Sequence, residues 1–155
     1  MLNLKSVNNI VRRAGIDDLE DIVNIENRVF KEPWNRDQLS YELSQVSGKI
    51  VNVIEEKEII GYIMIQKLHE EAHILNIAID VRFQCRGYGK KLLKYSLGEL
   101  GKGIDVFLEV RESNLQARKL YSDFNFEGID TRERYYSDGE NALVMHRRVE
   151  THGVV

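Results

Sequence analysis

A short glycine-containing segment is the first place in this sequence where residue types and spacing indicate a chemical role. It reads Gln84-Cys85-Arg86-Gly87-Tyr88-Gly89-Lys90, follows an apolar run at 74–79 and precedes leucines at helical spacing over 92–100. Glycines let backbone N–H groups approach an anion, and the N-terminus of a following helix adds partial positive charge. The segment therefore predicts a cradle for a diphosphate, built mainly from backbone donors with added charge from Arg86 and Lys90.

A carboxylate inside an apolar strand is the second candidate. Glu109 lies in Val106-Phe107-Leu108-Glu109-Val110, where burying a charge is costly unless the group is paired or used. One interpretation makes Glu109 a general base that takes a proton from a substrate ammonium. The other makes it a strand-end residue paired with Arg111 or Arg118. The residues alone leave both interpretations open.

A helical segment at 114–124 carries two further polar candidates. Tyr121 shares an apolar face with Ala117, Leu120 and Phe124, and an aromatic residue at such spacing is usually packed in the core. Asn114 opens the segment and is well suited to N-cap it.

Cysteine and histidine give no independent site. Cys85 is the only cysteine, and we interpret it as a loop residue because no His or Asp arrangement around it would activate a nucleophile. The histidines lack a metal-ligand spacing, so we predict no metal site; they are His69, His73, His146 and His152.

The remaining patterns predict the elements that would position these residues. Expected strands are 10–13, 49–55, 59–68, 72–80, 105–110, 126–136 and 141–147; expected helices are 17–30, 36–47, 87–100 and 114–124. Residues 49–80 read as an antiparallel meander, and the last two strands as a hairpin around Ser137-Asp138-Gly139. One β–α–β unit sets 72–80 and 105–110 side by side and parallel, with the glycine loop at the end of the former. The whole is a mixed α/β sheet with helices on its faces.

Two helix boundaries follow from single residues. Asp17 or Asp18 is suited to N-cap the first helix. In the second, Leu39 and Val46 keep helical spacing up to Gly48, which we expect to end it.

Composition places the chain among ordinary soluble proteins. It has 155 residues, 43% hydrophobic and 30% charged, and fits one domain at 1–149 with a C-terminal tail at 150–155. A net charge of −3 gives no reason to expect nucleic acid as a partner. A single cysteine excludes an internal disulfide and fits a reducing compartment. The start of the chain has no apolar signal region, and no run is long enough to span a membrane, so we expect a cytoplasmic protein without a membrane partner.

Several stretches are similar to one known family. Gln84-x-x-Gly87-x-Gly89 fits the Gln/Arg-x-x-Gly-x-Gly/Ala pyrophosphate motif of the GCN5-related N-acetyltransferases (GNAT), and the chain resembles that superfamily up to Val149. Within it, the chain looks most like the bacterial ribosomal-protein-alanine N-acetyltransferases. The narrower likeness rests on Asn76-Ile77-Ala78-Ile79-Asp80, Leu108-Glu109-Val110-Arg111, Ser113-Asn114, Leu120-Tyr121, Tyr135-Tyr136-Ser137-Asp138-Gly139 and Glu32-Pro33-Trp34.

The sequence departs from the family pattern at two places. Val81 stands where proline is usual after Asp80, and Asn125 stands where glycine is usual before Phe126. Asparagine tolerates left-handed backbone better than most residues, so we interpret the second departure as structural.

The resemblance implies a fold, a co-substrate and residue roles. It implies a mostly antiparallel sheet with helices on both faces, in which strands four and five are parallel and splay apart. It implies acetyl-CoA as co-substrate and direct attack by an amine, with Glu109 as general base and Tyr121 as general acid. Cofactor contacts are then expected from Ile77, Ala78, Ile79, Gln84, Cys85, Arg86, Gly87, Tyr88, Gly89, Lys90 and Asn114, and acceptor contacts from Trp34, Tyr135 and Tyr136.

The narrower resemblance implies an acceptor as well. It is the N-terminal alanine of a small-subunit ribosomal protein, after removal of methionine. Protein lysine, a polyamine or another small amine remains an alternative acceptor on the same fold. A CoA-binding sensor without catalysis is a third possibility, against which the presence of both Glu109 and Tyr121 speaks.

Overall fold

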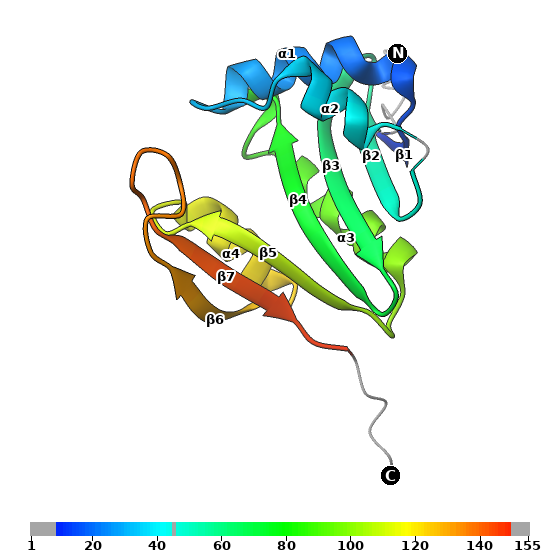
Figure 1. The fold of residues 1–155 in the computed structure, drawn as a ribbon. Coiled ribbons are helices and arrows are strands. Elements are labelled where there is room, and N and C mark those ends of the chain that lie inside the picture. The colour runs from blue at the N-terminus through cyan, green and yellow to red at the C-terminus, as the bar shows by residue number, and fades with distance from the viewer. Residues whose placement is uncertain (1–8, 45, 150–155) are drawn as a thin grey trace, which may run out of the picture.

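The computed structural model describes residues 9–149 except residue 45, and within them seven strands form one sheet (Figure 1). The spatial order is β1-β2-β3-β4-β5-β7-β6. The strands are β1 (Ile10–Arg13), β2 (Lys49–Glu55), β3 (Ile59–Leu68), β4 (Glu71–Ile79), β5 (Asp105–Arg111), β6 (Glu127–Arg132) and β7 (Ala142–Arg147). Neighbours are antiparallel except β4 and β5, which are parallel, so the predicted meander and β–α–β unit are confirmed.

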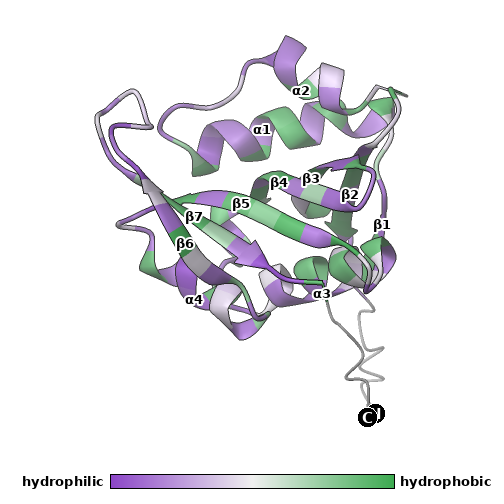
Figure 2. Cartoon of the chain, turned by 60° about the horizontal axis from the view of Figure 1, so that its bottom comes forward, coloured by the Kyte–Doolittle hydropathy of each residue, from purple (hydrophilic) through white to green (hydrophobic). Residues whose placement is uncertain are grey.

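Helices cover both faces of this sheet. They are α1 (Leu19–Val29), α2 (Arg36–Glu42), α3 (Tyr88–Leu100) and α4 (Leu115–Asp123), with short 3₁₀ turns at Ile16–Asp18 and Val81–Phe83. Figure 2 shows α1 and α2 on one side of the sheet and α3 and α4 on the other. None of the helices in the described part of the chain is long and apolar enough to cross a membrane.

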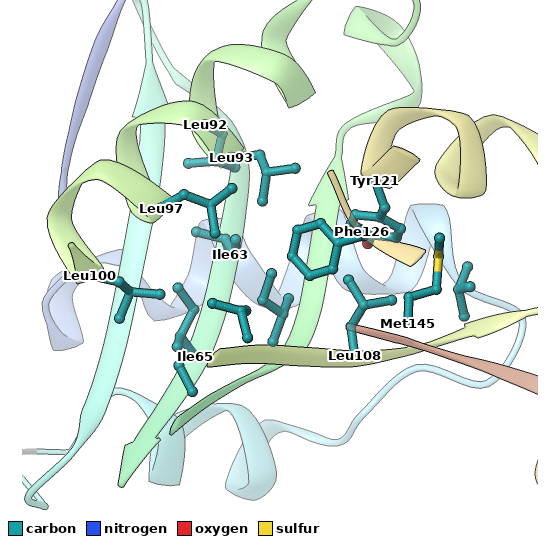
Figure 3. Close-up of a cluster of buried hydrophobic side chains, with 14 of the residues drawn as sticks. Ile63, Ile65, Leu92, Leu93, Leu97, Leu100, Leu108, Tyr121, Phe126 and Met145 are labelled. Carbon is teal, nitrogen blue, oxygen red and sulfur yellow. The ribbon is translucent and has the colours of Figure 1, made fainter. Parts of the chain in front are cut away.

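Each pair of helices buries its own apolar cluster. On the α1–α2 face, Ile22, Ile25 and Leu39 pack with Tyr62 and Met64 of β3. On the other face, four leucines of α3 point at the sheet, and Tyr121 of α4 packs beside Phe126 and Leu108 (Figure 3). The two faces of β3 therefore serve two cores, which explains why its sequence is apolar almost throughout.

The central strands part half-way along their length. β4 pairs with β5 only over Glu71–Ile74 against Asp105–Leu108. The β3–β4 register then shifts, because Met64 faces Asn76 while Ile65 faces Ile74, and Leu75 is the extra residue of a β-bulge. A bulge bends its strand and increases the local twist. Beyond Leu75, β4 continues with β3 while β5 continues with β7, and the two strands diverge (Figure 1).

The second helix is shorter than predicted. α2 starts as expected, with Asn35 and Gln38 each accepting a backbone N–H of the other at 2.9 Å, but it ends at Glu42. Val46 is 48% exposed and belongs to the connection into β2. Gly48 has a φ of +83°, and a Cβ on it would lie 2.2 Å from the carbonyl oxygen of Lys67. Its role is therefore close approach to β3, and the prediction that it ends the helix was wrong.

The first and last predicted boundaries also change. Asp18 precedes α1, but its carboxylate binds the Arg12 guanidinium at 2.9 Å and the Gly15 N–H at 2.8 Å, so it makes no capping bond to α1. The strand predicted at 126–136 ends at Arg132, and residues 133–141 form a loop. Asn125 has a φ of +68°, as expected for an asparagine in place of glycine.

Candidate active site

A cleft of about 1140 Å³ opens where β4 and β5 part. One wall carries the glycine loop, the start of α3 and α4, and we call this the loop side. The other carries the end of α1, Trp34 and the 133–141 loop, and we call this the aromatic side. Glu32 accepts a hydrogen bond from the Ser137 hydroxyl across the aromatic side, so two segments distant in sequence close it together.

The glycine loop leads directly from β4 into α3. Gly87 is the residue before the helix and has a φ of +84°, while the N–H groups of Tyr88, Gly89 and Lys90 lie in the first helical turn. Such N–H groups have no partner inside a helix, so they are available to an anion. The Gln84 side chain donates to the carbonyl of Ile79 at 2.9 Å and fixes the loop on the end of β4.

The charged side chains of the glycine loop are less well placed to bind an anion in the cleft than its backbone N–H groups are. Lys90 lines the cleft, but its Nζ lies 3.6 Å from the Asp123 carboxylate. Arg86 is not among the lining residues; its guanidinium lies 5.8 Å from the centre of the Phe83 ring. Cys85 lines the cleft with a φ of +62°, and its sulfur accepts a bond from Gln116 at 3.2 Å. The segment thus brings free backbone N–H groups to the cleft, with Lys90 as its lining cation.

Replacing Gly87 with alanine should lower the free energy of unfolding by about 1–2 kcal/mol, the cost of left-handed backbone for an L-residue. A Cβ at Gly87 would meet no atom within 4 Å, so the loss is conformational and not steric. Gly98 of α3 has equally open space and no positive φ, so Gly98→Ala should instead stabilise by about 0.5–1 kcal/mol. Urea unfolding of both variants measures the two values, and equal signs would contradict the assigned loop conformation.

Glu109 reaches the cleft from β5 and is paired, but not with the arginines considered from the sequence. Its Oε2 lies 2.5 Å from His73 Nε2 and its Oε1 lies 3.6 Å from the Arg132 guanidinium. Arg111 instead binds Asp138 and Glu140, and Arg118 donates to the Glu112 carbonyl. The hydrogen bond from His73, helped by charge from both partners, holds the pKa of Glu109 below its usual range in spite of partial burial.

Tyr121 reaches the cleft from α4, on the loop side. Its ring is buried and packs against Phe126 at a centroid distance of 5.7 Å (Figure 3). Burial raises the pKa of the phenol, and the nearby Tyr136 adds to the shift. Its hydroxyl has no hydrogen-bond partner among the described residues. Tyr121 is thus a core residue and a cleft-lining phenol at once.

Side chains alternate between the two faces of β5, and this alternation places the Glu109 carboxylate and the Tyr121 phenol on different sides of the sheet. Leu108 and Val110 belong to the cluster that contains Tyr121, so Glu109 between them points to the opposite face of β5. The carboxylate and the phenol therefore meet the cleft from different sides, the phenol on the loop side and the carboxylate on the face that carries α1. Asn114 caps α4, as predicted, by accepting the Ala117 N–H at 3.1 Å, and it also lines the cleft.

The predicted aromatic residues do gather on the aromatic side. Trp34, Tyr135 and Tyr136 all line the cleft, although the two tyrosines lie in a loop and not in the predicted strand. Their rings make an edge-to-face pair at 5.1 Å, and the Arg111 guanidinium lies 4.1 Å from the Tyr136 ring centre. Burial raises the pKa of Tyr136 to about 12.

Glu26 is a cleft residue that the sequence reasoning missed. It is 1% exposed on α1, where it accepts hydrogen bonds from the Tyr62 hydroxyl, the Asn76 side chain at 2.8 Å and the Trp34 N–H at 3.0 Å. A glutamate at helical spacing with Leu19 and Ile22 was a usable signal. His73, the partner of Glu109, gave no such signal, because its pairing depends on the register between β4 and β5.

The backbone of β4 beyond Leu75 lines the cleft as well. Ile77, Ala78 and Ile79 are all lining residues, and β5 no longer pairs with this segment. The expected cofactor residues of β4, the loop and α4 are thereby brought together, with the exception of Arg86.

Comparisons with known proteins agree on one family. The model of the acetyltransferase (GNAT) family matches residues 19–126. The [ribosomal protein bS18]-alanine N-acetyltransferase of Haemophilus ducreyi is 38% identical over 136 residues, 83% of this chain and 92% of that protein. An N-alpha-acetyltransferase of Sulfolobus acidocaldarius is 29% identical, over 91% of this chain and 93% of that protein.

A solved structure gives the same result. The ribosomal-protein-S18-alanine N-acetyltransferase of Escherichia coli superposes with a TM-score of 0.86 at 28% identity, over 94% of this chain and 97% of that one. The shared sheet, with its parallel β4–β5 pair, is the one predicted from the sequence. The chain therefore belongs to the acetyltransferase (GNAT) family and is an acetyl-CoA-dependent N-acetyltransferase.

Proposed function

We propose that this protein is a cytoplasmic enzyme that acetylates the α-amine of the N-terminal alanine of a small-subunit ribosomal protein. The likeness to a bS18-alanine N-acetyltransferase over 92% of that protein's length supports the acceptor. The observation that carries the chemistry is the cleft between β4 and β5, which presents a carboxylate from one face of the sheet and a phenol from the other.

Acetyl-CoA fits the loop side of this cleft. The N–H groups at the start of α3 would bind its pyrophosphate, and Asn114 lies beside the same groove. The edge of β4 at Ile77, Ala78 and Ile79 has backbone groups that β5 does not take, and these suit the amide groups of the pantetheine arm. The acetyl group would then lie at the fork of the strands.

The acceptor amine fits the aromatic side. Trp34, Tyr135 and Tyr136 shape the slot, and the carboxylates of Glu26 and Glu32 lie along it. Glu109 takes a proton from the ammonium, and the free amine attacks the thioester carbonyl carbon. As the tetrahedral intermediate collapses, the C–S bond breaks and Tyr121 gives its proton to the leaving sulfur. The second proton of the amine nitrogen leaves the intermediate and restores the phenol. No covalent enzyme intermediate forms.

The α-amine is easier to activate here than lysine. Its pKa of about 7.7–8.0 lies roughly 2.5 units below that of lysine, which is about 3.4 kcal/mol less free energy for deprotonation. Because Glu109 has a lowered pKa, it is a weak base, and a weak base suits the less basic amine.

Two peptides test the acceptor. One carries the N-terminal sequence of bS18 after methionine removal, and the other has the same sequence with a blocked α-amine and an internal lysine. With acetyl-CoA we expect thiol release and a mass increase for the first peptide alone. Acetylation of the blocked peptide would assign the enzyme to lysine, and acetylation of neither would send the search to polyamines and other small amines. Binding of CoA without turnover of any amine would favour the sensor.

A further inference from the structure

Glu109 touches a second titratable side chain that stands outside the cleft. His73 lies in the paired segment of β4, just before the strands part, and is not among the lining residues. Its Nε2 is 2.5 Å from Glu109 Oε2, and 40% of its side chain is exposed, against 11% for Glu109. The imidazole therefore connects a cleft-lining carboxylate with the solvent on the outside.

The reaction has to discharge one proton in every cycle. When an ammonium becomes an amide, two protons leave the nitrogen; one ends on the CoA sulfur and the other is released to water. A carboxylate with a lowered pKa gives that proton up at neutral pH, and the side chain in hydrogen-bond contact with it is the nearest acceptor. Imidazole is the side chain best suited to pass a proton near pH 7.

We propose that His73 is the proton exit of this enzyme, receiving the amine proton from Glu109 and releasing it to solvent. The inference rests on the proposed role of Glu109 as base. With its own proton on Nδ1, the imidazole takes the proton of Glu109 at Nε2 as the O–H bond breaks, and the imidazolium then gives its Nδ1 proton to water or buffer. The Nε2–H that remains donates to the restored carboxylate, and exchange with water returns the ring to the Nδ1–H form. No group is oxidised or reduced. His73 touches no reacting atom, so it is a positioning and relay residue.

The other charged or titratable groups around Glu109 do not fit this task. Arg132 of β6 lies 3.6 Å from Oε1, but a guanidinium has no site for another proton. Tyr136 of the 133–141 loop interacts with Glu109 by charge only, and its phenol is already protonated at neutral pH. His73 is in hydrogen-bond contact and has a nitrogen that can take the proton.

Two substitutions separate proton transfer from positioning. In His73→Gln the side-chain amide can still donate a hydrogen bond to Glu109 but cannot carry a proton, and in His73→Ala both functions are lost. We expect both to lower kcat by about 10²-fold, the low end of the range for proton-transfer groups, with both KM values within about twofold. Added imidazole should restore kcat of His73→Ala in proportion to its concentration and leave the wild type unchanged.

A wild-type kcat in His73→Gln together with a slow His73→Ala would mean that the ring only positions Glu109, and would overturn the proposal. A wild-type kcat in His73→Ala would overturn it as well. His69→Asn is the matched control, because it removes an imidazole from the tip of the β3–β4 turn, where φ is +55° and asparagine is tolerated. This variant should keep the wild-type kcat.

The experiments distinguish a wrong assignment of the acceptor amine from a wrong assignment of His73 as the proton exit. If wild type ignores the alanine peptide but acetylates another amine, the His73 variants are compared on that amine. If it acetylates none, the ring ¹⁵N shifts of His73 decide, because they should change in Glu109→Gln when the contact exists. Unchanged shifts would overturn the proton exit independently of activity.

Discussion

Replacing Glu109 with glutamine should lower kcat for acetyl transfer by about 10²- to 10⁴-fold, the usual contribution of a positioned general base. Glutamine keeps the size of the side chain and can still accept a hydrogen bond, but it cannot take the ammonium proton. The KM for acetyl-CoA should stay within about twofold, because the carboxylate faces away from the loop side. Steady-state thiol release with a saturating amine acceptor measures both constants.

The matched control is Glu112→Gln, three residues along the chain and exposed. It removes the same charge near the same site and should leave kcat within about twofold, as for most surface substitutions. A Glu109→Gln enzyme that retains wild-type kcat would show that the carboxylate is a structural partner of His73 and Arg132, and the amine would then need another base.

The dependence of wild-type kcat/KM on pH should reflect the protonation of Glu109 and of the acceptor amine. The base acts as a carboxylate, and a lowered pKa keeps that form populated to below the usual pH range of a glutamate. Glu109 therefore does not limit activity above about pH 5. Between pH 6 and 7, kcat/KM should rise about tenfold as the α-ammonium, with a pKa of about 7.7–8.0, loses its proton, and the rise should level off above about pH 8.

Tyr121→Phe should lower kcat by about 10²-fold or more, because the leaving sulfur loses its proton donor. Its stability should change by less than about 1 kcal/mol, since the hydroxyl has no partner among the described residues and the ring contact with Phe126 is kept. Kinetics and urea unfolding on the same preparation distinguish the two effects. Tyr95→Phe, on the exposed side of α3, is the control and should match wild type in both measurements.

An unchanged kcat in Tyr121→Phe would assign the residue to the core alone. A large loss of stability together with the loss of activity would mean that the fold, and not the proton, had been damaged. The raised pKa of the phenol bears on this test, because it keeps Tyr121 protonated through the whole working range of pH.

Much of the fold was predictable because its signals are local. The meander over 49–80, the glycine loop before α3 and the left-handed Asn125 all depend on residues close together in sequence. The end of α2 was not predictable in this way, because Gly48 is required by the neighbouring β3 rather than by the helix. Residues 133–136 of the 133–141 loop were likewise predicted as strand; Arg111 on β5 binds two of the carboxylates of this loop.

The site residues also fall into two groups, those with a local sequence signal and those placed by contacts between distant strands. The residues of the cradle and of α4 could be named from motifs, and the structure places them around one cleft, except for Arg86. The contact between His73 and Glu109 joins two strands that are 36 residues apart. It exists only because those strands pair in one register up to the Leu75 bulge, and register between distant strands has no signature in a single sequence.

The fork in the sheet has a consequence for how the two substrates affect each other. β4 and β5 pair only at Glu71–Ile74, so the two halves of the sheet are joined by a short ladder and by the apolar cluster under α3 and α4. Both ligands would bridge the two halves: CoA would touch the α3 loop on one half and α4 on the other, and the acceptor would touch α1 and the 133–141 loop. A first substrate that ordered the fork would remove that ordering cost for the second. The two affinities would then be coupled, and each substrate would strengthen the binding of the other by the same factor although they enter from opposite faces.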